Sequence, residues 1–235
     1  MKVFFLFSLS MLVGCSQVDV SEPKIVGGRL VTDEDQEKLS TVALTASGRA
    51  FCTGTLIDRK WVLTAAHCLG QRLSISFGLV ASRGESVPVT RSIRHPQGFD
   101  IGLVELAEEA PSWTIPVEIL SDDYVLSQGD PLILAGFGQT SPNGGGGGTL
   151  KTVTTVFDQV QVERKEIWFG PTSGKSACRG DSGGPAYVLV NGALKVVGAT
   201  NGGHRPPACS GSGRYADARA HREWIEKEME GNLSF

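Results

Sequence analysis

The chain has 235 residues, and 40% of them are hydrophobic, which is enough to form the core of one large domain or two small ones. Its formal net charge is -3, with acidic and basic residues interspersed. These values exclude a disordered chain, and they offer no basic field that would concentrate nucleic acid or anionic lipid. We therefore expect no nucleic-acid partner.

The first fourteen residues predict a signal peptide. An apolar run at residues 4–13 suits the hydrophobic region of a secretory signal and is too short to span a bilayer. Residues 12–15, Leu-Val-Gly-Cys, resemble the lipobox of bacterial lipoproteins, in which the cysteine is acylated. This interpretation requires a bacterial source and predicts an outer-membrane lipid anchor on Cys15. The alternative is that Cys15 is a small residue near an ordinary cleavage site.

Cysteine usage favours the lipid anchor. Five cysteines are an odd number for an exported protein, and lipidation of Cys15 would account for the odd one. The other four allow three pairings, among which connectivity alone does not choose. They are Cys52, Cys68, Cys178 and Cys209.

A short polar segment separates the signal from the folded part. Residues 15–24 end in a Pro-Lys step and contain no core of their own, so they predict a tether or propeptide. The predicted division is a signal peptide at 1–14, a lipid tether and activation propeptide at 15–24, and one folded domain at 25–235.

Short runs of β-prone residues recur from residue 40 onward with turn residues between them, which predicts an all-β fold. The clearest hairpin joins residues 186–190 to 194–198 through Asn191-Gly192, because Asn-Gly supplies the two positive-φ residues of a tight type I′ turn. The other runs lie at residues 51–57, 61–65, 73–80, 101–106, 131–137 and 150–157.

Two segments depart from the β pattern. Five consecutive glycines at residues 144–148 predict a mobile surface loop, because ordering them costs backbone entropy and gives no side chain to pack. A phosphate-binding role would require a following Lys-Ser/Thr pair, which is missing. Residues 217–230 predict a helix that Asp217 caps. Its apolar face is Ala220, Trp224, Ile225 and Met229.

Three motifs carry candidate chemistry. A hydroxyl is a poor nucleophile at neutral pH, so acyl-transfer enzymes pair a serine with a histidine base and with a carboxylate that orients the imidazole. Ser182 lies in residues 180–185, Gly-Asp-Ser-Gly-Gly-Pro, where glycines allow a strained turn and close approach of a substrate to backbone N–H groups. His67 ends a β-prone run just before Cys68, and Asp100 opens an apolar run.

Each motif alone has an ordinary alternative, because a lone histidine is often structural and a strand-leading aspartate is often a turn residue. Here the three occur together in the order His67, Asp100, Ser182, which differs from the orders in subtilisin and the α/β-hydrolases. With residues 25–28 (Ile-Val-Gly-Gly) and 136–140 (Gly-Phe-Gly-Gln-Thr), these motifs make the chain resemble the chymotrypsin/trypsin family of serine proteases.

The resemblance spans residues 25–235 and implies two six-stranded antiparallel β-barrels, with the C-terminal helix packed against the second. It implies an endopeptidase in which Ser182 attacks the scissile carbonyl and His67 accepts and returns the proton. Asp100 would orient the imidazole, and the N–H groups of Gly180 and Ser182 would bind the oxyanion. No metal or cofactor is needed for this chemistry.

The resemblance also assigns the disulfides. Cys52 would pair with Cys68 beside the histidine, and Cys178 with Cys209 beside the specificity pocket. The segment after the first pair has Glu85 as its single acid before residue 95, which argues against the calcium loop of some relatives.

Residues 25–28, following Lys24, resemble the activation site of the family. Cleavage after Lys24 would free the α-amino group of Ile25, which would insert beside Asp181. A buried carboxylate needs a charged partner, and pairing would order the oxyanion loop. The chain is then an inactive precursor that needs an activating protease, and the same cut would release the enzyme from a lipid on Cys15.

The resemblance places Ser176 at the floor of the specificity pocket, where Lys or Arg would find no counter-charge. Gly203 and Gly213 align with the pocket walls and leave room for Phe, Tyr, Leu or Met. The family's Ser-Trp-Gly segment, which pairs with the substrate backbone, is replaced at residues 200–203 by Thr-Asn-Gly-Gly. A trypsin-like preference remains the alternative, because an acidic group from elsewhere could reach the pocket.

A second class of function is a catalytically retired protease fold that serves as a binding protein. All of the triad residues His67, Asp100 and Ser182 are present, which favours the active enzyme. We expect protein or peptide substrates and a monomeric chain.

Overall fold

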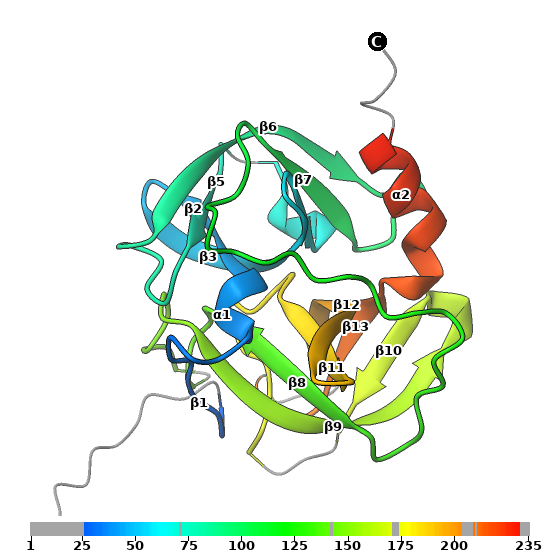
Figure 1. Cartoon of the computed structure of the whole chain (residues 1–235). Helices are drawn as coiled ribbons and strands as arrows, with labels where there is room; N and C mark the ends of the chain where they lie inside the picture. The colour runs from blue at the N-terminus through cyan, green and yellow to red at the C-terminus, as the bar shows by residue number, and fades with distance from the viewer. Residues whose placement is uncertain are drawn as a thin grey trace, which may run out of the picture.

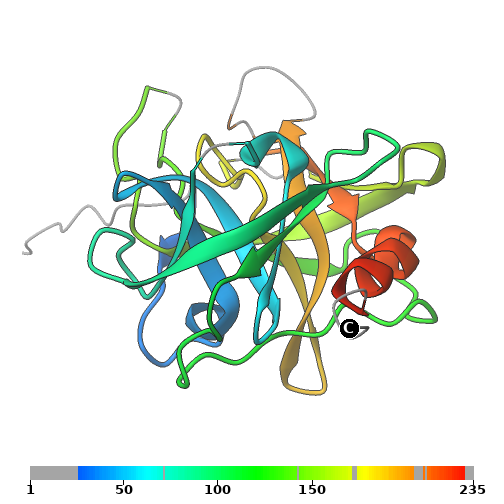
Figure 2. The same ribbon diagram turned by 90° about the horizontal axis from the view of Figure 1, so that it is seen from above.

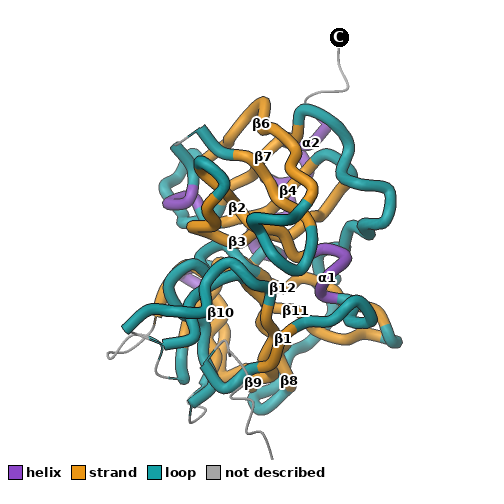
Figure 3. Tube along the Cα trace, turned by 90° about the vertical axis from the view of Figure 1, so that its left-hand side faces the viewer, coloured by secondary structure: helices purple, strands orange, loops and turns teal. Residues whose placement is uncertain are grey.

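Two β-barrels lie side by side in the computed structural model of the chain, as Figures 1 and 3 show. The structure describes residues 26–70, 72–141, 143–170, 174–203, 209 and 211–230. The predictions made for Cys15, Lys24 and Ile25 lie outside these ranges.

The first barrel is closed and antiparallel, and its strands follow one another around the ring in the order β2-β3-β4-β7-β6-β5. The strands are β2 (Thr41–Ala46), β3 (Arg49–Asp58), β4 (Trp61–Thr64), β5 (Ser74–Phe77), β6 (Glu85–Arg94) and β7 (Gly102–Leu106). A short helix, α1 (Glu37–Ser40), precedes them, and a single 3-10 turn, η1 (Ala66–Cys68), follows β4.

The second barrel consists of six antiparallel strands in the order β9-β10-β13-β12-β11-β8, and pairing of β8 with β9 closes it. Its strands are β8 (Pro131–Gly136), β9 (Lys151–Gln161), β10 (Glu166–Phe169), β11 (Pro185–Val190), β12 (Ala193–Gly203) and β13 (Gly213–Asp217). A two-residue strand, β1 (Arg29–Leu30), adds to β9 from outside the ring. The predicted fold of two six-stranded antiparallel barrels is confirmed.

The local predictions for strands and turns agree well with the structure. Each predicted run overlaps a strand, and β11 and β12 form the predicted hairpin. Asn191 and Gly192 have φ angles of 50° and 80°, as a type I′ turn requires. The glycine run at residues 144–148 has no regular secondary structure and carries four positive φ angles, so it is a loop as predicted.

The helix prediction is wrong at its start. Asp217 is the last residue of β13, a 3-10 turn (η3, Arg219–His221) follows, and the helix α2 spans Arg222–Glu230. The Asp217 carboxylate accepts a hydrogen bond from the Arg219 backbone N–H at 3.1 Å, so it closes the turn between strand and helix. Within the described ranges, no helix has the length and apolar content that crossing a membrane requires.

The helix α2 contacts the first barrel, which the prediction of packing against the second barrel did not include. The Trp224 ring lies 4.6 Å from the His95 ring, between centroids, and His95 belongs to the connection from β6 to β7. Arg91 of β6 donates a hydrogen bond to the Glu228 carbonyl at 3.3 Å. Figures 1 and 2 show α2 on the outside of the molecule, near β6. The C-terminal segment therefore ties the second barrel to the first.

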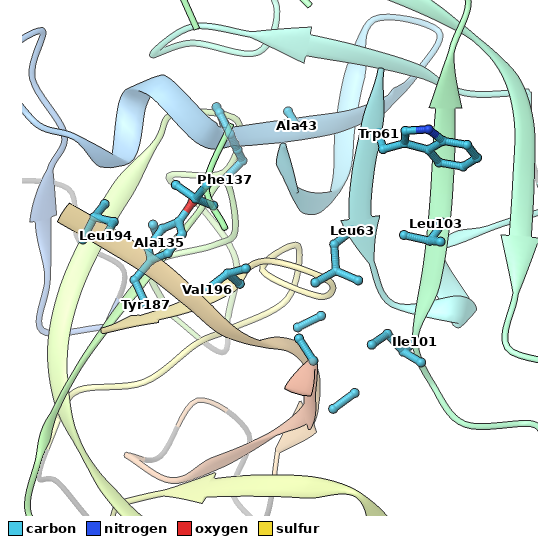
Figure 4. Close-up of a cluster of buried hydrophobic side chains, with 14 of the residues drawn as sticks. Ala43, Trp61, Leu63, Ile101, Leu103, Ala135, Phe137, Tyr187, Leu194 and Val196 are labelled. Carbon is cyan, nitrogen blue, oxygen red and sulfur yellow. The ribbon is translucent and has the colours of Figure 1, made fainter. Parts of the chain in front are cut away.

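A hydrophobic cluster fills the space where the barrels meet, and Figure 4 shows its side chains. Leu63 and Leu103 enter it from the first barrel, and Tyr187 and Val196 enter it from the second. The Tyr187 hydroxyl is 2.8 Å from the Ser40 hydroxyl, so its one polar atom is satisfied across the interface. Burial of this much apolar surface fixes the two barrels relative to each other, which a site built from both requires.

Candidate active site

His67 and Asp100 come together at the edge of the first barrel. Strands β4 and β7 pair antiparallel, with Thr64 opposite Gly102, so the residues just after β4 meet those just before β7. The Asp100 carboxylate accepts two hydrogen bonds from His67, one from ring Nδ1 at 2.7 Å and one from the backbone N–H at 2.9 Å. The imidazole is therefore held in one orientation, with Nε2 directed away from the carboxylate.

This pair shifts the pKa of both groups. Burial raises the pKa of Asp100, but the hydrogen bonds from the His67 ring and backbone outweigh it, so the pKa is lowered overall. The hydrogen bond to Asp100 raises the pKa of His67 against burial and against the positive charge of Arg94. The carboxylate thus stays ionised and stabilises an imidazolium.

Ser182 lies in a tight turn that docks against the first barrel. The backbone N–H of Thr53 in β3 donates to the Ser182 carbonyl at 2.8 Å, and its hydroxyl donates to the Gly180 carbonyl at 2.8 Å. Cys68 Sγ lies 3.5 Å from the same Ser182 oxygen. A Cβ on Gly183 would come within 2.0 Å of the Thr64 hydroxyl, so only glycine fits there. The turn is thus seated beside His67.

The backbone around Ser182 leaves donors available. Gly180 has φ +95°, and a Cβ there would lie 3.0 Å from the Gly138 Cα. Within the described ranges, the N–H groups of Gly180 and Ser182 donate to no protein acceptor. In the same ranges, no hydrogen bond joins the Ser182 hydroxyl to the His67 ring, a contact that often forms only with substrate bound. A ligand oxygen above the turn could accept from both N–H groups.

Asp181 lies directly beneath this turn and is buried. Its carboxylate accepts hydrogen bonds from the Cys178 and Gly138 backbone N–H groups, both at 2.8 Å. A Cβ on Gly136 or Gly138 would lie 2.2 Å or 2.5 Å from the carboxyl group, so both positions must be glycine to make room for it. This is the physical reason for the glycines of the 136–140 motif.

A second buried charge lies close to Asp181. Lys151 of β9 has no solvent exposure, and its ammonium group donates to the carbonyls of Gly138 at 3.1 Å and Thr149 at 2.6 Å. Burial raises the pKa of Asp181 to about 6, although the two backbone hydrogen bonds and the Lys151 charge lower it. Lys151 therefore offsets only part of the cost of burying this carboxylate.

A pocket opens beside Ser182 in the second barrel. Of the three residues predicted for it, Ser176 and Gly213 line the pocket, while Gly203 pairs with Gly213 across β12 and β13. Phe169 also lines it, and its ring lies 2.5 Å from where a Cβ on Gly213 would be. The described lining residues are Phe169, Ser176, Ala177, Cys178, Arg179, Ser182, Thr200, Gly202, Cys209, Ser212 and Gly213. Among these described lining residues, the one with a charged side chain is Arg179, a cation.

Both disulfides have the pairing that the resemblance implied. Cys52 is bonded to Cys68 next to His67, and Cys178 is bonded to Cys209 at the pocket. The sulfurs of Cys52 and Cys68 lie close to the His67 ring, but their bond to each other leaves no thiolate for a metal. The disulfides are typical of a secreted or extracellular protein.

Sequence reasoning missed three residues of the site, Thr53, Lys151 and Phe169. Nothing in their local sequence marks them, because each acts through contacts between distant segments. A charged residue at the start of a β-prone run predicts solvent exposure, yet Lys151 is fully buried.

Comparisons with known proteins agree with this geometry. The Trypsin family model matches residues 25–225. "Trypsin 5G1" of Aedes aegypti is 30% identical over 90% of this chain and 86% of its own length. "Chymotrypsin-like elastase family member 1" of Rattus norvegicus is 27% identical over 84% of this chain and 86% of its own length.

Solved structures show the same likeness. A structure entitled "Neuropsin, a serine protease expressed in the limbic system of mouse brain" superposes with a TM-score of 0.74 at 26% identity. The match covers 86% of this chain and 98% of the other. The two barrels, the matched model and these relatives together show that the chain belongs to the trypsin family and is a serine endopeptidase.

Proposed function

We propose that His67, Asp100 and Ser182 are the catalytic residues of this endopeptidase. The observation that carries the proposal is the 2.7 Å contact from His67 Nδ1 to Asp100, which fixes the ring beside the docked Ser182 turn. The Ser182 hydroxyl attacks the scissile carbonyl carbon and His67 Nε2 takes its proton. The N–H groups of Gly180 and Ser182 stabilise the oxyanion.

The second half of the reaction uses the same groups. Collapse of the tetrahedral intermediate breaks the peptide C–N bond, and His67 gives its proton to the leaving amine. Water then loses a proton to His67 and attacks the acyl-enzyme. The bond from the acyl carbon to Ser182 Oγ breaks, the acid is released, and His67 returns the proton to Ser182 Oγ.

A fluorophosphonate probe tests the assignment, because it reacts covalently with a serine that has an organised base. We expect the activated protein to be labelled and Ser182→Ala to remain unlabelled. Labelling of the variant would place the nucleophile elsewhere. A folded wild-type protein that is not labelled after activation would favour the alternative of a retired protease fold used for binding.

We propose a preference for large apolar residues before the scissile bond. Ser176 lines the pocket, is 2% exposed and offers a hydroxyl but no negative charge. The ring of Phe169 adds apolar surface to the lining. A Lys or Arg side chain would be buried there without a partner, at a cost of several kcal/mol.

A peptide library in which only the residue before the scissile bond varies tests this preference. We expect Leu, Met, Phe and Tyr to be cleaved well, and Lys and Arg poorly. Ser176→Asp is the matched variant, because it adds a carboxylate at the same place and should move the preference toward basic residues. Efficient cleavage after Lys by the wild type would support the trypsin-like alternative.

We propose that the chain is made as a precursor and activated by cleavage after Lys24. Buried Asp181 has two backbone donors and a raised pKa, so an α-amino group from Ile25 would be a favourable third partner. Val26, the next residue, already pairs with Ser176, whose N–H donates to the Val26 carbonyl at 3.2 Å. The new amino terminus would then lie near the pocket loop.

The proposed specificity implies a separate activating protease, because a pocket without negative charge would not accept Lys24. Purified precursor kept alone should remain uncut and almost inactive. Adding a protease that cleaves after basic residues should produce a chain beginning at Ile25 together with activity. Spontaneous processing at Lys24 would contradict both the specificity and the need for a second enzyme.

We propose that residues 1–14 are a signal peptide and that Cys15 carries a lipid in a bacterial outer membrane. The support is sequence alone, namely the apolar run, the lipobox-like residues and the odd cysteine that the two disulfides leave over. In a bacterial host, radiolabelled fatty acid should enter the precursor and be absent from Cys15→Ala. Cleavage at Lys24 would then release a monomeric enzyme to the periplasm or exterior, and unlabelled wild type would contradict the anchor.

A further inference from the structure

Arg214 of β13 lies beside a position of the pocket wall that has no side chain. It pairs with Gly202 of β12, and Gly202 lines the pocket together with Ser182. A Cβ on Gly202 would lie 3.4 Å from Arg214 Nε and 3.5 Å from Nη2. Because residue 202 has no side chain, nothing from that position covers the guanidinium.

The charge of Arg214 is only partly neutralised. Its nearest carboxylate is Glu166, at 3.9 Å, and that group already accepts hydrogen bonds from Asn201 Nδ2 and Trp168 Nε1, both at 3.0 Å. In the described ranges Arg214 donates no hydrogen bond, and its Nε is buried without a partner. The side chain is nevertheless 36% exposed. It is a cation with unused donors that solvent can reach.

Other arginines surround the same cleft. Arg179 is exposed and lines the pocket beside Ser182. Arg94 is close enough to His67 to lower the pKa of its ring, and Arg214 is close enough to Asp100 to lower the pKa of that carboxyl. The chain as a whole carries a net charge of -3, so these three arginines differ in sign from its overall charge.

Both acidic groups beside these arginines are already engaged. Asp100 holds the His67 ring and backbone, and Glu166 holds Asn201 and Trp168. A peptide that enters the cleft with an acidic side chain would therefore meet available cations rather than a closed ion-pair network. A basic side chain at the same place would be repelled.

We propose that the enzyme selects peptides with a glutamate or aspartate close to the scissile bond, and that Arg214 is the specificity-determining residue that binds this carboxylate beside Gly202. The inference rests on the proposed endopeptidase function and on its apolar pocket. It adds a second requirement to that pocket, namely a negative charge on a neighbouring substrate residue.

The test uses the activated enzyme and peptides that share one leucine before the scissile bond. Each peptide carries Glu, Gln or Lys at one of the three preceding or two following positions, and kcat/KM is measured. Gln has the shape of Glu without its charge. We expect Glu to exceed Gln by about tenfold at one position, with Lys below both. The ratio should fall as salt is added, because the site is partly exposed.

Arg214→Gln should bring the ratio of Glu to Gln close to one, and Arg214→Lys should retain part of it. Arg164→Gln is the matched control, because Arg164 is exposed in the turn between β9 and β10. A wild-type ratio near one at every position would overturn the proposal. So would an Arg214→Gln enzyme that is slower on all peptides but keeps the ratio, because Arg214 would then act only through Asp100.

Binding separates this proposal from the catalytic assignment. Ser182→Ala protein should bind the Glu peptide about tenfold more tightly than the Gln peptide, whether or not the wild type turns over. Absence of wild-type turnover with a retained binding preference would contradict the proposed function alone. Turnover that depends on Ser182 but shows no preference for acidic peptides would contradict the role of Arg214 alone.

Discussion

Asp100 bonds to His67 and Asp181 precedes Ser182 in its turn, and the environments of the two aspartates shift their pKa values in opposite directions. Asp100, just before β7 in the first barrel, keeps partial solvent access and receives two hydrogen bonds from His67, and its pKa is lowered. Asp181, between the pocket loop and β11 in the second barrel, is buried, and its pKa is raised to about 6.

The difference shows how burial and charge partners separate two identical side chains. In the proposed mechanism His67, the partner of Asp100, becomes positive during the reaction, so an ionised carboxylate would stabilise it. Asp181 has two backbone donors and Lys151, which reduce but do not cancel the cost of burial. A carboxylate in this state gains from one further cation, and the proposed α-amino group of Ile25 would supply it.

The largest expected effect comes from removing the group on which both aspartates act. Ser182→Ala should lower kcat by five to six powers of ten, because loss of one triad member disables the whole unit. Thermal stability should stay close to that of the wild type. In this background Asp100→Asn should cause almost no further loss in kcat. A further large loss would show that Asp100 does not act through Ser182.

Asp100→Asn alone should lower kcat by about ten-thousand-fold, as is typical when the carboxylate of a Ser-His-Asp triad loses its charge. Because the hydrogen bond to Asp100 is the main cause that raises the pKa of His67, that pKa should fall in the variant. The base then stays neutral at lower pH, so the acid limb of kcat/KM should move to lower pH. An unmoved limb would mean that another group titrates there.

Asp181→Asn should lower kcat/KM of the cleaved enzyme by about a thousandfold, since the N–H donors of Gly180 and Ser182 lose their support and each such donor contributes a hundredfold or more. The conservative control is Asp122→Asn, an exposed aspartate paired with Arg222. Its effect on kcat/KM should be small. Full activity of Asp181→Asn after cleavage would contradict the ion-pair mechanism.

Asp181→Asn should also change how the free energy of unfolding of the uncleaved chain depends on pH. A raised pKa means that native Asp181 holds a proton which the unfolded chain has lost between about pH 4 and pH 6. The free energy of unfolding should therefore fall as the pH rises through this window, and Asp181→Asn should reduce that fall. After cleavage at Lys24, the α-amino group should reduce it as well. Denaturant unfolding at pH 4, 5, 6 and 7 measures both.

Local sequence predicted the candidate catalytic residues better than it predicted the residues that hold them in place. The glycines and the strand-end positions of His67, Asp100 and Ser182 are local features, so short stretches of sequence were enough to propose these residues as a triad. Strand β6 was not singled out, because it places charged and polar residues on an exposed face and lacks a long apolar run. Thr53 and Lys151 depend on contacts across the barrels, which no short window of sequence contains.

The start of the C-terminal helix is decided by a local capping pattern on one side and by strand pairing on the other. Aspartate before an apolar helical pattern predicts a cap, and residues 217–230 carry that pattern. Asp217 is instead the last residue of β13, because pairing of β13 with β12 continues to Gly198 opposite Asp217. Long-range pairing in the second barrel therefore determined where the helix begins, and the helix starts five residues later than predicted.

The smallest expected effect concerns Lys151. This buried lysine lies near Asp181, and it is one of the differences between the surroundings of Asp181 and those of Asp100. Lys151→Met removes two hydrogen bonds to the Gly138 and Thr149 carbonyls, which should cost about 1–3 kcal/mol of stability. Because the Lys151 charge lowers the pKa of Asp181, that pKa should rise further in the variant. The fall in the free energy of unfolding of the precursor should then extend to higher pH than in the wild type.

The matched control is Lys195→Met, because Lys195 pairs with exposed Glu118 at the surface and its loss should cost less than about 1 kcal/mol at any pH from 5 to 8. Activity of cleaved Lys151→Met should stay within about tenfold of the wild type, since Asp181 would still have its backbone donors and the α-amino group.

Burial lowers the pKa of Lys151, so its charge must be tested directly. A loss of stability that is the same at pH 5 and pH 8 would show that the charge of Lys151 does not act on Asp181. Asp181 would then depend on the α-amino group alone for its counter-charge.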